Sequence, residues 1–457
     1  MRNRTNQVGN EFEELRSANL QADDFIRLAL AGAKENPTAY LSRAELEHQA
    51  YPSQLTLREW WLALKIQRLA GRREIALADR DGRPFSLASG DFFAALLHDL
   101  DRDVAGTGEG PEILTHRNTR DYFAARASAE EAMASCRLDG LVFEPAVGEE
   151  LLRTSRRPAD DAERTLLNTQ RGLEFVRQSR ALPLTLALLS DLHQRLTSET
   201  LPRPDAGGRL RRADEPVTLE PGPERHEPPP AASLPARLKA LLALANGRAP
   251  SYFIHPLVRA AVVQFWVLHD QPFPAANGRL ARALFLWVVL RAGYPIFDYL
   301  APSRALAAAP GAWARAFGQV LADDNDLNYF VAHQLAAVER ARRHFRDEAR
   351  RHAGATRAAA ELLSAQPDLN HRQHALVAQA LAEPGRRHTL RAHARAHGLS
   401  RQSARNDFTA LVRAGLFEET KAGKTLAFFP VPELRAKLGL DAKVEPGAAG
   451  DAGAGAG

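Results

Sequence analysis

The spacing of apolar and polar positions predicts a mostly helical chain with a few short strands. Between residues 115 and 354, apolar residues recur three and four apart, as in 160–177 and 182–196. This is the period of a helix that buries one face. Near the N-terminus, residues 75–87 hold two short apolar runs around Asp81-Gly82, which predicts a β-hairpin with a tight turn. The predicted fold class is mainly α.

Breaks in this pattern divide the chain. Gly207–Pro230 is rich in proline and charge and cannot be a helix. A composition shift follows at Gln366-Pro367-Asp368, and residues 447–457 contain only Gly, Ala and Asp, so this tail should be disordered. We therefore predict an N-terminal helical region at 1–110, a core domain at 111–355, a smaller domain at 368–434 and a disordered tail at 435–457.

Composition adds limits on location and partners. The chain has 457 residues, 45% of them apolar, which is enough for two or three domains. The most apolar run, Ala283–Leu290, is too short to span a bilayer, so no membrane partner is expected. A single cysteine, Cys136, excludes an internal disulfide and favours the cytoplasm. The net charge of +5 is weak evidence for nucleic-acid binding by itself.

The segment 271–282 carries the strongest functional signal. It reads Gln-Pro-Phe-Pro-Ala-Ala-Asn-Gly-Arg-Leu-Ala-Arg, a loop that feeds an apolar and therefore buried helix, with Asn277 as the expected N-cap. Arg279 and Arg282 are three apart and should share one face at the positive end of this helix. The arrangement suits a polyphosphate, although the arginines could instead pair with acidic residues.

The region after residue 371 predicts a second functional unit. Helices are expected at 371–381, 388–397 and 400–414, the last capped by Ser400, and strands at 416–417 and 425–429. This order is typical of a winged helix, a module that serves either DNA binding or protein interaction. The DNA-binding candidates are on the third helix and at the tip of the wing: Arg401, Gln402, Arg405, Asn406, Lys421 and Lys424.

The segment 271–282 resembles the motif of the Fic (Fido) family, H-P-F-x-[DE]-G-N-G-R-x-x-R, without a gap. The likeness extends to Phe253–Ala260 before the motif and to Arg291-Ala292-Gly293-Tyr294 after it, and it covers at least residues 115–350. It implies an all-helical core that transfers AMP from ATP to a Ser, Thr or Tyr hydroxyl. Some Fic proteins similarly carry a winged helix after this core.

The chain departs from the family motif at the positions that carry the chemistry. Gln271 stands at the position of the catalytic histidine, and an amide cannot act as a base near neutral pH. Ala275 stands at the position of the acidic Mg²⁺ ligand, so no metal site is expected. Ala276 replaces a glycine and would be strained at a positive φ. The residues that the resemblance assigns to nucleotide binding are Phe273, Ala276, Asn277, Gly278, Arg279 and Arg282.

Two further segments match family features. The helix expected near 118–140 ends in Ser135, Asp139 and Gly140, which resembles the inhibitory pattern [ST]-x-x-x-E-[GN] with aspartate in place of glutamate. In the family this acid pairs with the second motif arginine, here Arg282; the alternative is a plain helix end at Asp139-Gly140. The loop 208–230 stands at the place of the family's flap, with Val217, Thr218 and Leu219 as the strand that docks a target or partner protein.

The sequence thus predicts an impaired or inactive Fic-type adenylyltransferase that acts as a nucleotide- or partner-binding regulator joined to a DNA-binding-like domain. ATP is the candidate cofactor, and the missing acid argues against Mg²⁺. Partners are a protein at the flap, DNA at the winged helix, and a second copy in a homodimer. Two alternatives stay open. One is an active AMPylator or other nucleotidyl transferase that uses a different base, with His269 as the first substitute to consider. The other is a transcriptional regulator whose Fic core is a scaffold.

Overall fold

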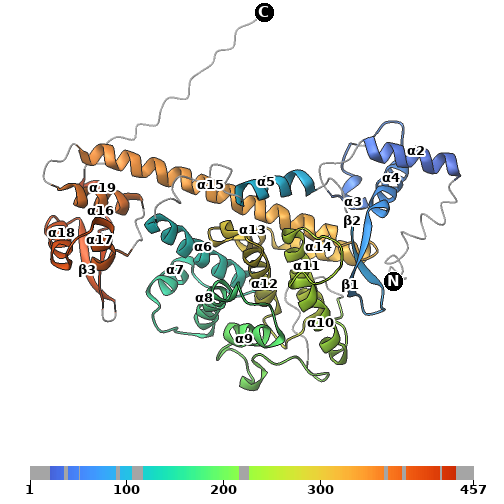
Figure 1. Cartoon of the computed structure of the whole chain (residues 1–457), viewed down its shortest axis with the longest axis horizontal. Helices are drawn as coiled ribbons and strands as arrows, with labels where there is room; N and C mark the ends of the chain where they lie inside the picture. Colours follow the sequence, from blue (N-terminus) through green and yellow to red (C-terminus); the bar gives the residue numbers. More distant parts are fainter. Residues whose placement is uncertain are drawn as a thin grey trace, which may run out of the picture. The chain divides into compact units, whose positions relative to one another are not determined.

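The computed structural model describes residues 21–34, 40–50, 52–88, 93–104, 117–215, 226–364, 369–382, 387–422 and 425–438. Most of them are helical, as the sequence predicted (Figure 1). The chain divides into two compact units, at 1–345 and 346–457. No helix of the described part is long and apolar enough to cross a membrane.

The first unit begins with a small helical layer and the predicted hairpin. The described elements that precede the core are α2 (Ala22–Lys34), α3 (Arg43–Leu46), α4 (Leu57–Ala70), β1 (Arg72–Ala78) and β2 (Pro84–Ala88). The strands are antiparallel, and Gly82 in the turn has a φ of 81°, which glycine adopts without strain. Thr56 caps α4 by accepting a hydrogen bond from the Glu59 backbone N–H at 3.2 Å.

The remaining elements of this unit surround one long apolar core. In chain order they are α5 (Ala94–Val104), α6 (Arg117–Leu138), α7 (Pro145–Thr154), α8 (Asp161–Ser179), α9 (Leu186–Leu196), η3 (Pro204–Ala206), η4 (Ala231–Ser233), α10 (Leu234–Ala245), α11 (Pro256–Asp270), α12 (Asn277–Arg291), η5 (Pro295–Asp298), α13 (Pro302–Ala307), α14 (Pro310–Ala322) and α15 (Asn328–Ser364), which continues into the second unit. Helix α12 packs against α11, α8, α6 and α9 (Figure 1). It therefore lies at the centre of the core.

The second unit has its own core around Phe408, Phe417 and Phe428. Its elements are α16 (His371–Ala382), α17 (Leu390–His397), α18 (Arg401–Arg413), β3 (Phe417–Ala422), β4 (Thr425–Pro430) and α19 (Leu434–Lys437). Ser400 caps α18 as predicted, with its hydroxyl accepting from the Ser403 N–H at 3.1 Å. The second helix was expected to start at His388, but His388 is extended and pairs with Phe428 of β4.

Buried charges fasten α4 to the turn that precedes α15. Lys65 forms an ion pair with Asp323, and both side chains are buried. The Tyr329 hydroxyl donates to Asp323 at 2.6 Å, and Arg68 donates to the Tyr329 oxygen at 2.9 Å. The guanidinium of Arg68 also lies over the ring of Tyr40, 3.9 Å from its centroid. These contacts hold the N-terminal layer against the core.

Lys65→Met should lower the free energy of unfolding by about 3–5 kcal/mol, because it leaves a buried carboxylate without its counter-charge. Urea denaturation followed by circular dichroism measures the loss. The matched control is the double variant Lys65→Met/Asp323→Asn, which removes both charges and should lose less than the sum of the two single variants. Strictly additive losses would show that the pair does not couple the two segments.

Candidate functional site

The predicted motif lies at the junction of the two central helices. Helix α11 ends at Asp270, a loop follows, and α12 starts at Asn277. Every residue from Asn277 to Leu290 is buried, which confirms the expected central helix. The first backbone N–H to bond within α12 is that of Leu280, to the Ala276 carbonyl. The N–H groups of residues 277–279 therefore precede the hydrogen-bond ladder, at the positive end of the helix.

The prediction that Asn277 is the N-cap of α12 was wrong, and the contacts that Asn277 makes instead explain how the loop is closed. Ala276, not Asn277, occupies the N-cap position, with φ 58° and ψ 22°. Asn277 instead accepts from the Phe273 N–H at 3.0 Å and donates to the Phe273 carbonyl at 2.8 Å, so it closes the loop from within. The left-handed backbone of Ala276 costs about 1–2 kcal/mol relative to an ordinary conformation. The strain expected from an alanine at this place is present.

The two motif arginines are held together by one aspartate. Arg279 donates from Nε to Asp139 Oδ2 at 2.8 Å, and Arg282 donates from Nη2 to Asp139 Oδ1. Arg282 also donates to the hydroxyl and the carbonyl of Ser135, at 2.7 and 2.8 Å, and Arg279 donates to the Leu196 carbonyl at 3.2 Å. Although aspartate is shorter than glutamate, it reaches both guanidiniums. The arginines are therefore paired with protein groups in this conformation.

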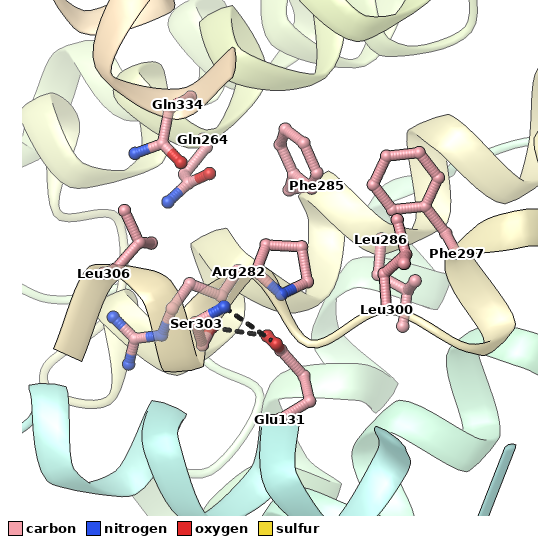
Figure 2. A pocket seen from close by; sticks show the side chains of 11 residues that line it. Glu131, Gln264, Arg282, Phe285, Leu286, Phe297, Leu300, Ser303, Leu306 and Gln334 are labelled. Atoms are coloured by element: carbon pink, nitrogen blue, oxygen red, sulfur yellow. Dashed lines mark hydrogen bonds between the residues drawn. The ribbon is translucent and has the colours of Figure 1, made fainter. Parts of the chain in front are cut away.

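Helix α6 and the turn directly after it supply polar side chains at intervals of four residues. Ser135 precedes Asp139 by four, and Glu131 precedes Ser135 by four, so all three share one face. Figure 2 shows Glu131 pointing at Ser303, whose backbone N–H donates to it at 2.9 Å and whose hydroxyl bonds it as well. Burial raises the pKa of Glu131, and its hydrogen bonds with Ser303 oppose the rise. A cavity of about 10 Å³ beside Arg282 holds at most one water.

The side chain of Gln271 is buried and points back into α11. Its Nε2 donates to the Leu268 carbonyl at 2.8 Å, while its Oε1 is buried with no hydrogen-bond partner among the described residues. An amide in this position can accept a hydrogen bond but cannot take up a proton near neutral pH. The structure therefore offers no base at residue 271.

The residues around the motif loop do not fit Mg²⁺, which prefers several oxygen ligands. Ala275 has no donor atom, and the Asn277 amide is occupied by Phe273. Asp270 already accepts from Arg237, Trp266 and His269, and Asp139 is occupied by the arginines. We accordingly assign no metal to the loop.

His269 is a buried helix-end residue, not a surface one. Its Nδ1 lies 2.8 Å from Asp270 Oδ1, and its ring packs edge-on against Phe85 at a centroid distance of 5.0 Å. The ring of His226 lies 4.6 Å away, and His226 Nε2 donates to the His269 carbonyl at 2.6 Å. Its neighbours are thus core residues, an environment that supports a structural role.

A histidine that the sequence did not single out supports the motif loop. His193 of α9 is fully buried and stacks on Phe273, with ring centroids 4.0 Å apart. Its Nε2 donates to the Ala275 carbonyl at 3.0 Å, and its Nδ1 accepts from the Gly208 N–H at 2.9 Å. This pair of bonds requires the neutral ring. A Cβ at Gly208 would lie 2.8 Å from the Ser190 carbonyl oxygen, so the close approach requires glycine.

Arg211 is a second residue that sequence reasoning missed. It is buried, and its Nε donates to the Gln271 carbonyl at 2.7 Å while its backbone N–H donates to the Pro272 carbonyl at 3.0 Å. Its Nη2 also reaches the Pro229 carbonyl, so one side chain ties both ends of the loop 208–230 to the motif. The expected flap residues Val217, Thr218 and Leu219 lie outside the described residues.

The candidate DNA-binding residues of α18 share an exposed face. Arg401, Gln402, Arg405 and Asn406 are all exposed. Gln402 donates to the Asn406 side-chain oxygen at 3.0 Å. On the opposite face Asp407 is buried and bonds Arg372 and His393, both at 2.9 Å. Lys424 and the side chain of Lys421 lie outside the described part.

The region around the motif is similar to a known protein family and to known proteins. Residues 183–289 match the model of the Fic/DOC family. The chain is similar to protein adenylyltransferase Fic of Culex quinquefasciatus, with 30% identity over 112 residues, and of Drosophila grimshawi, with 28% over 137 residues. These alignments cover 24% and 30% of this chain but only 21% and 26% of the relatives, so the chain spans about a quarter or less of their length.

Solved structures give a looser likeness. A Fic family protein from Desulfovibrio desulfuricans G20 aligns with a TM-score of 0.47 and 18% identity, over 74% of this chain and 96% of that one. Fic-1 from C. elegans aligns with a TM-score of 0.44 and 17% identity, over 55% of this chain and 72% of that one.

His193 should make stability depend on pH. Burial lowers its pKa from the ordinary 6.5 to about 4, so its contribution to stability is complete above pH 6.5 and is lost as the pH falls toward 4. In that window His193→Gln should lower the slope of unfolding free energy against pH by up to about 1.4 kcal/mol per pH unit. Chemical denaturation at several pH values measures the slope. An equal slope in the two proteins would contradict a neutral buried ring.

Proposed function

Since the chain contains a Fic domain, whose family model covers residues 183–289, we propose that it is a Fic-type protein that binds the phosphates of an adenine nucleotide at the start of α12 and transfers the nucleotide poorly or not at all. The observation that carries the proposal is the single carboxylate of Asp139 that bridges Arg279 and Arg282. Two buried guanidiniums beside helix amides that precede the intrahelical hydrogen bonds form a site for an anion larger than that carboxylate.

The same contacts support a role for Asp139 as a competitor of the nucleotide. Both arginines are occupied by the end of α6, so phosphate oxygens reach them only after Asp139 has left. Ser135 holds the second arginine through its hydroxyl and carbonyl, so displacement involves the whole end of the helix and not one side chain. Occupancy by nucleotide would then be coupled to movement of α6.

The chemistry around Gln271 supports an impaired transferase. A missing general base costs about 10²–10⁴ in rate, and the loop provides neither a base nor a metal ligand. His193 and His269, which flank the motif, are each engaged through a ring nitrogen and packed among aromatic rings. The competing proposal is an active transferase that uses another base. That base would be His193, His269 or a residue outside the described part.

The triple variant Gln271→His/Ala275→Asp/Ala276→Gly should transfer labelled AMP from ATP at least about 10²-fold faster than the wild type, because it restores the base and the acid and relieves the strain at Ala276. Both proteins carry Asp139→Ala in this assay so that its carboxylate no longer competes with the nucleotide for the two arginines. Incorporation into the protein itself and into a cell lysate, with Mg²⁺, is measured by autoradiography.

The matched control adds Arg282→Ala to the triple variant and should return incorporation to the wild-type level, since the phosphate contact is lost. Equal labelling by the wild type and the triple variant would show that Gln271 does not limit transfer. The wild-type Fic domain would then be an active enzyme with a different base.

A second candidate function belongs to the C-terminal unit. We propose that it is a winged helix that binds duplex DNA through α18. Three helices precede an antiparallel hairpin, the extended His388 adds a bridge to β4, and the exposed face of α18 presents two arginines and two amide side chains. Such side chains suit phosphates and base edges in the major groove. A protein-interaction module is the alternative.

Arg401→Ala/Arg405→Ala should weaken binding to duplex DNA and reduce the slope of log affinity against log salt by about 2, one for each lost phosphate contact. Fluorescence anisotropy with labelled duplexes at several salt concentrations measures both quantities. The matched control is Arg343→Ala/Arg350→Ala, which removes two exposed arginines of α15. Equal effects of the two double variants would favour the interaction module.

A further inference from the structure

A second hollow with positive charge lies beside α8, away from the motif loop. Its volume is about 210 Å³. The lining includes Arg157 before α8, Arg164, Asn168 and Arg171 of α8, and Ser198 and Glu199 after α9. Helices α8 and α9 pack against each other (Figure 1). The hollow is lined by α8 and by the segments before α8 and after α9.

The lining carries three guanidiniums and one carboxylate, a net charge of +2. Arg157 and Arg171 are exposed, and their guanidinium groups have no hydrogen-bond or ion-pair partner among the residues that the structure describes. Arg164 pairs through Nη1 with Glu199, but its Nε is buried and has no hydrogen-bond partner in the described chain. The carboxylate of Asp161 lies 3.8 Å from that Nε, beyond hydrogen-bond reach. The hollow therefore has unused donors.

The spacing of the arginines suits an anion between them. Arg164 and Arg171 are seven apart, which places them two turns apart on one face of α8. Between them the buried Asn168 donates to the Ser198 carbonyl at 2.6 Å and so links α8 to the segment after α9 within the hollow. Guanidinium groups bind phosphate oxygens through pairs of parallel N–H donors. The single exposed carboxylate of Glu199 cannot occupy all the N–H donors of the arginines.

We propose that this hollow is a binding site for a phosphate-bearing small molecule, whose phosphoryl group lies among Arg157, Arg164 and Arg171. The volume of about 210 Å³ is enough for a diphosphate or a phosphate ester. It is below the ~300 Å³ at which pockets enclose a drug-sized ligand, so only the phosphate end of a nucleotide fits inside. The site is separate from the proposed nucleotide site at α12.

Glu199 is the internal competitor for this ligand. Its side chain is largely exposed, and its backbone is left-handed with a φ of 56°, which disfavours a residue with a side chain. A dianionic phosphate placed between the arginines replaces its single charge. The ligand therefore competes with Glu199 for the arginines. Loss of the Glu199 charge should strengthen binding, and loss of the arginines should weaken it.

The test is isothermal titration of pyrophosphate into the full-length protein. Arg164→Ala/Arg171→Ala should weaken binding at least about tenfold, because hydrogen bonds to a charged group contribute more than a neutral pair. The matched control Arg153→Ala/Arg350→Ala removes two exposed arginines outside the hollow and should change the affinity less than about twofold. Thermal melting confirms that each variant is folded.

Glu199→Gln should strengthen pyrophosphate binding, and a weaker affinity in that variant contradicts the site. A parallel titration with AMP identifies the source of the phosphate. If the affinity for AMP also depends on Arg164 and Arg171, the ligand is a nucleotide phosphate. If only the affinity for pyrophosphate depends on them, the ligand is free diphosphate. Both results support the site. The proposal is overturned if the wild type does not bind pyrophosphate at millimolar concentration, or if both arginine double variants bind as the wild type does.

Discussion

Burial of α12 on every side is the constraint from which the arrangement of the core follows. A helix that carries two arginines in its first two turns can lie at the centre of a protein only if each guanidinium has polar partners, since an unpaired buried charge costs several kcal/mol. Helix α6 provides these partners through Ser135 and Asp139, and the end of α9 adds the Leu196 carbonyl. The packing of α6 and α9 against α12 thus provides the polar partners that the two arginine side chains require.

The same constraint explains which parts of the site could be read from the sequence. The apolar run after Asn277 specifies a buried helix by composition, and the spacing of Arg279 and Arg282 places them on one face. Asp139 could be found because Ser135, Asp139 and Gly140 resemble the inhibitory pattern of the Fic family; the local sequence alone was equally consistent with a plain helix end. Local patterns of this kind depend on neighbours along one helix, and the structure has them where they were expected.

Other parts depend on contacts between distant segments, which no local pattern records. His193 and Ala275 are 82 residues apart, and Arg211 and Gln271 are 60 apart. Asn277 has the composition of an N-cap, but the preceding loop turns back so that its amide bonds Phe273 instead. The prediction failed there because tertiary contact outweighed a local preference.

The bridge between Asp139 and the two arginines has a consequence for the free protein. Opening the end of α6 without a replacement would leave two buried guanidiniums without the counter-charge of Asp139, so the open form is rare unless another anion takes the vacated place. By mass action, each anion that binds only the open form shifts the population toward it in proportion to its concentration. The conformation of α6 then becomes a readout of the anion content of the surrounding solution, and phosphate, sulfate and chloride buffers would yield different populations of the same protein.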